Sequence, residues 1–71
     1  MKTTDEICRI VSFGGGVIID STKTTGDLEK IAGFAKNKCK VIIKGAKNKT
    51  TDDLCRIGSF GGGAVIFALT E

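Results

Sequence analysis

The chain has 71 residues and a net charge of +3. This length is enough for one small domain and excludes a multi-domain enzyme with a large buried active site. Apolar residues make up 41% and charged residues 27%, which is typical of a globular chain and not of a disordered tail. Histidine is absent, which excludes Ser-His-Asp and Cys-His catalysis within one chain. We therefore expect no enzyme and no cofactor.

The first predicted element is a helix that begins after Thr3. The spacing of Thr3 and Glu6 is a capping signature. The threonine hydroxyl can accept an unpaired backbone N–H of the first helical turn, and the glutamate can reach back to the start of the helix. One helical face follows with i, i+3, i+4 spacing, formed by Ile7, Ile10 and Val11. Phe13 and three glycines end the helix, and the β-branched run 17–19 is a predicted strand.

This pattern returns twice further along the chain. Residues 50–63 are identical to residues 3–16 at eleven of fourteen positions, and a diverged copy occupies residues 24–34. The later copies lead into the β-branched runs 41–43 and 65–67. We expect a single domain, residues 1–71, of three tandem repeats at about 3–20, 24–44 and 50–69.

The predicted fold class is α/β. Strands joined through helices pair in parallel with right-handed crossovers, which gives a three-stranded sheet in sequence order with all helices on one face. This solenoid-like layout is similar to that of leucine-rich-repeat proteins in architecture alone, because the Leu-x-x-Leu-x-Leu pattern is absent. The helix-closing residues Phe13, Phe34 and Phe60 are expected in the core.

One face of this sheet has no helix of its own. Alternation along the strands places the isoleucine row (Ile18, Ile42 and Ile66) on one side and the remaining strand residues on the other. A row this small is tolerable in solvent. The alternative is that a second copy stacks on this face as a two-fold dimer, joins edge to edge, or exchanges units. We favour this alternative because a chain of this length buries only a small core. We expect a non-enzymatic, self-associating interaction module.

The middle of the chain is basic. Residues 23–49 hold eight Lys and two acids, a net charge of +6. Loops 20–25 and 44–51 lie at the carboxyl ends of the strands, where open α/β sheets bind ligands. The candidate anion-binding residues there are Lys23, Lys44, Lys47 and Lys49. The alternative function is binding of a polyanion or nucleic acid, although the segment has no Arg and the chain no Tyr or Trp. A solvated surface would also explain these charges.

Cysteine use and hydropathy favour a cytoplasmic protein without a membrane partner. No apolar run approaches the roughly 18 residues of a membrane span, and acids stand where a secretory signal needs apolar residues. The three cysteines, Cys8, Cys39 and Cys55, form neither an even set nor a Cys-x-x-Cys pair, so we expect no disulfide framework and no metal site. Cys8 and Cys55 are equivalent positions, expected as small boundary hydrophobes or partly exposed thiols.

Other motifs carry no catalytic prediction. The glycine triplets 14–16 and 61–63 run from helix to strand and are interpreted as turns, not phosphate loops. Segment 45–51 lacks the second glycine of a P-loop. Asp20 with Asp52 is the one carboxylate pair that an enzyme could use. The charged residues of the helices are expected to pair within a helix, Lys30 with Asp27 and Arg9 with Asp5 or Glu6.

Overall fold

Helices and strands alternate along the chain in a computed structural model that describes residues 2–70. The helices are α1 (Thr4–Ser12), α2 (Thr25–Ala35) and α3 (Thr51–Gly61), and a short 3-10 helix, η1, spans Ala46–Asn48. The strands are β1 (Val17–Asp20), β2 (Val41–Lys44) and β3 (Val65–Ala68).

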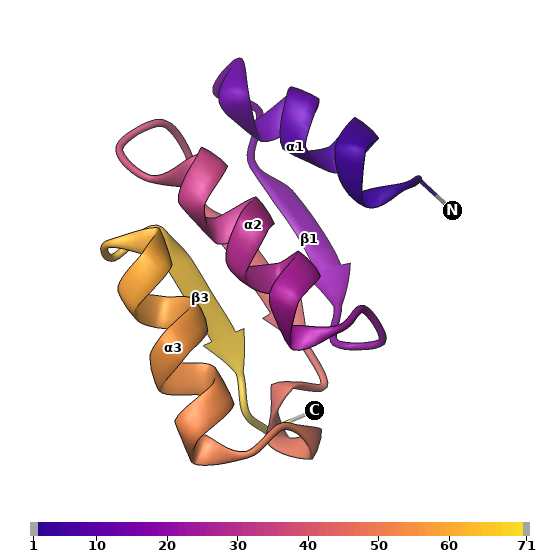
Figure 1. Ribbon diagram of the computed structural model, residues 1–71, viewed down its shortest axis with the longest axis vertical. Coiled ribbons are helices and arrows are strands. Elements are labelled where there is room, and N and C mark those ends of the chain that lie inside the picture. The colour runs from indigo at the N-terminus through magenta and orange to yellow at the C-terminus, as the bar shows by residue number, and fades with distance from the viewer. Residues whose placement is uncertain (1, 71) are drawn as a thin grey trace.

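The three strands form one parallel sheet in the order β1-β2-β3. Val17, Val41 and Val65 are in register, and so are the members of the isoleucine row. Figure 1 shows α1, α2 and α3 side by side over one face of the sheet. The α/β class, the strand order and the parallel pairing predicted from the sequence are confirmed.

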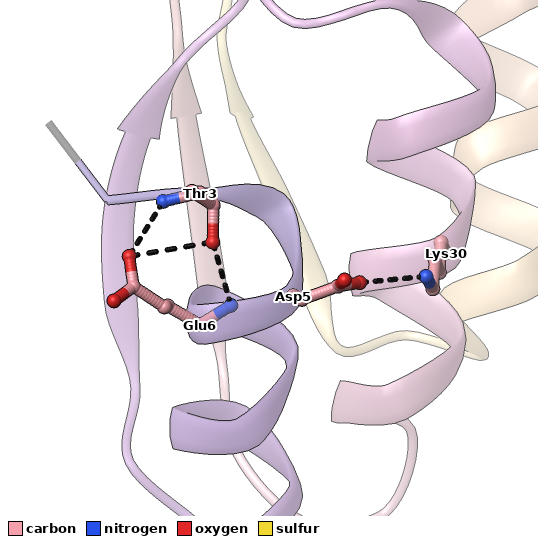
Figure 2. Close-up of polar contacts among 4 residues, drawn as sticks. All are labelled: Thr3, Asp5, Glu6 and Lys30. Carbon is pink, nitrogen blue, oxygen red and sulfur yellow. Dashed lines mark hydrogen bonds and ion pairs between the residues drawn. The ribbon is translucent and has the colours of Figure 1, made fainter.

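Each of the three α-helices begins at a capping threonine. The hydroxyls of Thr3, Thr24 and Thr50 each accept a backbone N–H three residues on, at 3.2 Å. The full reciprocal box forms at Thr3, whose N–H donates to Glu6 Oε1 at 2.9 Å (Figure 2). The other two caps have aspartate in place of glutamate, and a side chain one methylene shorter reaches the cap less readily.

The core fills the space between the helix layer and the sheet. Its largest fully buried side chains are Leu28, Ile31, Ile43, Ile57, Val11 and Val41. Val41 and Ile43 of the central strand are fully buried, because β2 has a strand on both sides, whereas the equivalent residues of β1 and β3 are half-buried.

The prediction that the phenylalanines belong to the core is wrong for the three that close the helices, whereas Phe67 of β3 is half-buried and packs against the core. Phe13 is 88% exposed, and Phe34 and Phe60 are also exposed. The core position in the last helical turn is the next residue, Ala35 in α2 and Gly61 in α3, both buried and four residues after a buried isoleucine. A rotation of about 100° per residue therefore turns Phe34 and Phe60 away from the sheet, while Phe13 follows the last residue of α1 as its C-cap.

Candidate functional site

The sheet face opposite the helices is uncovered and carries the isoleucine row. Ile18 is 63% exposed and Ile66 is 48% exposed, while Ile42 is half-buried between them. The strand register places the three side chains in one line across the sheet. The structure therefore brings the three predicted interface residues together on one apolar surface.

Opposite charges border this row at the carboxyl end of the strands. Asp20 and Lys44 are in register on β1 and β2, two residues beyond the isoleucine row, so they occupy the same sheet face. The hydroxyl and N–H of Thr22 both donate to Asp20 Oδ1 and lower the pKa of that carboxyl below its usual value. Asp20 is therefore ionised at neutral pH, and the uncovered face combines apolar, negative and positive groups.

The lysine candidates lie around two loops that touch each other. Lys49 Nζ donates to the backbone carbonyl of Lys23 at 3.1 Å, and Ser21 Oγ donates to the Gly45 carbonyl at 2.9 Å. Lys44 and Lys47 are exposed, whereas Lys23 and Lys49 are half-buried. The strand-to-helix loops are thus held together, but the Lys49 ammonium is engaged by the backbone and is a weaker anion-binding candidate than the other three.

A second apolar surface, which the sequence did not predict, lies on the outside of the helix layer. Phe34 of α2 and Phe60 of α3 line a shallow groove of about 430 Å³, together with Gly26, Glu29, Lys30 and Gly33. The two helical glycines leave the floor of this groove without side chains. Phe34 and Phe60 occupy equivalent positions in their helices, each one residue before the small buried residue of the last turn, Ala35 or Gly61, so the rotation described above would have indicated that both lie away from the sheet.

The ion pairs join neighbouring helices, so the predicted pairing within a helix is wrong. Lys30 Nζ of α2 lies 2.9 Å from Asp5 Oδ1 of α1, as Figure 2 shows. Arg56 Nε of α3 lies 3.6 Å from Glu29 Oε2 of α2. The bond from Lys30 lowers the pKa of Asp5, and Asp5 raises the pKa of Lys30. Because exposed ion pairs contribute little free energy, we assign these contacts only a small share of the stability.

The equivalent cysteines have different environments. Cys8 is buried, and burial raises the pKa of its thiol, whereas Cys55 is exposed. Cys39 is half-buried, and its thiol lies 3.5 Å from the carbonyl oxygen of Val11. Within residues 2–70, no three His, Cys, Asp or Glu side chains are grouped as a metal site would require. In the same residues, no helix has both the length and the apolar content needed to cross a membrane.

Comparison of the chain with protein-family models, with curated proteins and with solved structures gives no match.

Proposed function

We propose that this protein is a non-enzymatic interaction module that self-associates by stacking its uncovered sheet face on that of a second copy. The observation that carries the proposal is the exposure of Ile18 and Ile66 in line with Ile42. Parallel sheets normally have both faces covered, because their strands are apolar on both sides. Over residues 2–70, the helices lie on one face only (Figure 1).

The charges on this face favour a second copy over an unrelated partner. A two-fold interface brings the same patch of both subunits together, so the patch must complement itself. Asp20 and Lys44 give the face one group of each sign beside its apolar row. Each copy therefore offers the other a carboxylate for its ammonium and an ammonium for its carboxylate.

The exposed apolar area sets the expected affinity. Full burial of an isoleucine side chain contributes about 1.5–3 kcal/mol, and roughly half of that remains available at each end of the row. Two copies together gain at most about 5 kcal/mol before the loss of translational and rotational freedom is subtracted, so the dissociation constant is about 0.1–1 mM or weaker. The dimer is therefore expected at high protein concentration and not in dilute solution.

Sedimentation velocity from about 10 µM to 1 mM tests the proposal. Ile42→Lys places a charge in the centre of the row and should abolish this dimer. Phe34→Lys is the matched control, because it adds the same charge to an exposed apolar residue on the opposite side of the molecule. A wild-type protein that is monomeric throughout, or a loss of dimer with the control alone, contradicts the proposal.

We propose polyanion or nucleic-acid binding as a second function, supported by the contact between the two lysine-bearing loops. Exposed Lys44 and Lys47 would supply the charge beside the amino-terminal ends of α2 and α3. Retention on heparin or duplex DNA should fall with salt and with the double change Lys44→Glu, Lys47→Glu. Lys36→Glu with Lys38→Glu makes the same charge change at the other end of the strands. Equal losses in both variants would show nonspecific attraction only.

A further inference from the structure

Equivalent isoleucines of the three α-helices differ in burial, depending on whether their helix packs against a helix that precedes it in the chain. Ile10, Ile31 and Ile57 each stand seven residues after a capping threonine. Ile31 and Ile57 are 1% and 0% exposed, whereas Ile10 is 37% exposed. Helices α2 and α3 pack on a preceding helix, and within residues 2–70 α1 has none. The α1 edge is therefore the surface that, on α2 and α3, the preceding helix of the layer buries.

The opposite edge shows the reciprocal difference. Cys8, Glu29 and Cys55 each stand five residues after a capping threonine. Cys8 is buried and Glu29 is half-buried beneath the following helix, but Cys55 of α3 is exposed. We call the α1–β1 edge the head and the α3–β3 edge the tail.

The head carries two hollows, one on α1 and one between α1 and β1. One hollow of about 270 Å³ is lined by Lys2, Glu6, Arg9, Ile10 and Phe13. A second hollow of about 250 Å³ lies beside β1 and is lined by Lys2, Ile7, Ile10, Val17, Ile18 and Ile19. Both are largely apolar side-chain surfaces at the open end of the helix layer and the sheet.

The ion pairs between helices predict the charges at a head-to-tail contact. At the α1–α2 boundary, Asp5 pairs with Lys30, which stands six residues after its capping threonine (Figure 2). Arg56 holds the same position in α3 and pairs with Glu29. In α1 this position is Arg9, and in α3 the equivalent of Asp5 is Asp52; both are exposed. Asp52 of one copy is thus matched to Arg9 of the next.

The backbone of the two edge strands is also complementary. The N–H of Val17 donates to the Lys40 carbonyl at 3.3 Å, and the N–H of Val41 donates to the Ala64 carbonyl at 2.9 Å. Val65 is in register with both valines, so the same alternation directs its N–H to the outer edge of β3. If β1 of a second copy continued the sheet in the same register, the N–H of Val65 would lie opposite the Gly16 carbonyl of that copy.

We infer that copies of this chain join head to tail, with α3 and β3 of one copy packed against α1 and β1 of the next so that sheet and helix layer run on without interruption. The occupant of each edge is a second copy, because the two edges match each other in charge and in strand register. Such a contact is heterologous and does not close on itself, so it builds an open series and not a dimer. It deepens the proposed self-association but uses different residues from the sheet face.

The decisive experiment follows assembly in an Ile42→Lys background, which removes the sheet-face contact. Sedimentation velocity should show an average mass that rises past the dimer with concentration and reaches no plateau. Arg9→Glu and Asp52→Arg each place like charges across the contact and should weaken assembly by about fivefold. Lys38→Glu is the control, since it makes the same charge change as Arg9→Glu on an exposed residue of the α2–β2 turn.

Mixing the two charge variants separates a heterologous contact from general charge effects. Each variant alone has like charges at its head and its tail, so its copies repel one another. In the mixture, the head of the Arg9→Glu variant meets the tail of the Asp52→Arg variant, and the unchanged Arg9 meets the unchanged Asp52. The equimolar mixture should therefore recover the parent's assembly, and labelling of Cys55 by a thiol reagent should slow as assembly proceeds.

Three results would overturn the head-to-tail assembly. These are a monomer at every concentration in the Ile42→Lys background, a plateau at the dimer, and a mixture that assembles no better than its components. The sheet-face proposal fails separately, when Ile42→Lys leaves the wild-type mass distribution unchanged while the two charge variants reduce it.

Discussion

Shortening an isoleucine to alanine is expected to cost different amounts of stability at two equivalent helix positions. Ile31 of α2 is 1% exposed and belongs to the core, whereas Ile10 of α1 is 37% exposed at the open edge of the helix layer. Because both stand seven residues after a capping threonine, helix propensity and local sequence position are matched. The comparison therefore isolates burial by a neighbouring helix.

The magnitudes follow from the burial of each side chain. Removing three methylene equivalents costs about 2.4 kcal/mol of transfer free energy when the side chain is fully buried. At Ile31 a cavity adds to this, and we expect Ile31→Ala to lower the free energy of unfolding by about 3–4 kcal/mol. At Ile10 only about two-thirds of the area is lost and the space opens to solvent, so Ile10→Ala should cost about 1.5 kcal/mol.

Urea unfolding followed by circular dichroism at low protein concentration measures both values. A chain of this length is expected to have a stability of about 4–10 kcal/mol, so Ile31→Ala should remain folded but near its limit. The difference of about 2 kcal/mol corresponds to roughly 8–16 °C in Tm. Equal costs for the two variants in dilute solution would refute the reasoning, because they would mean that the α1 edge is already covered in the monomer.

Three further predictions concern thiols, glycines and pH. A thiol reagent should modify Cys55 rapidly and Cys8 only as urea unfolds the protein, because Cys8 is buried and its pKa is raised; similar rates in native buffer would contradict this. Gly33→Ala should raise the free energy of unfolding by about 0.5–1 kcal/mol, because a Cβ there meets nothing within 4 Å. Gly61→Ala should lower the free energy of unfolding by about 1–3 kcal/mol, because its Cβ would lie 2.6 Å from a methyl of Val65 in β3. Thermal unfolding compares the two glycine variants, and a Gly61→Ala protein more stable than the wild type would contradict this prediction. The pKa of Asp5 is lowered by its ion pair with α2, so the stability that its ionised form adds is complete above about pH 4 and is lost as the pH falls through the lower pKa of the folded state. Acid titration of unfolding should consequently show a shallower loss for Asp5→Asn than for the wild type, and parallel curves would argue against the pair.

Much of the fold was predictable because its signals are local. The capping threonines, the i, i+3, i+4 spacing of the helices and the β-branched runs each report on a few consecutive residues. Repetition of the helix–strand order then leaves little choice but parallel pairing with crossovers on one side. Alternation along the strands predicted that the three isoleucines of the row share one side of the sheet, and the structure shows that this side is the one away from the helices.

The errors arose where a residue's position depends on a neighbouring element. The phenylalanines were expected inside because they are large and apolar, but the helix phase and the small residues Ala35 and Gly61 decide which side chain meets the sheet. The charged residues were expected to pair along a helix, but the helices pack closely enough for Lys30 to reach Asp5.

The sequence by itself determined the elements, their order and the alternation of apolar residues, since each depends on interactions between residues close together in the chain. Only the tertiary structure decided that Cys8 is buried while its equivalent Cys55 is exposed, and that Ile10 is exposed while Ile31 and Ile57 are not. Near-identical segments differ in this way because burial is set by the helices on either side, and within the described residues 2–70 the first and last helices of the layer each have one neighbour.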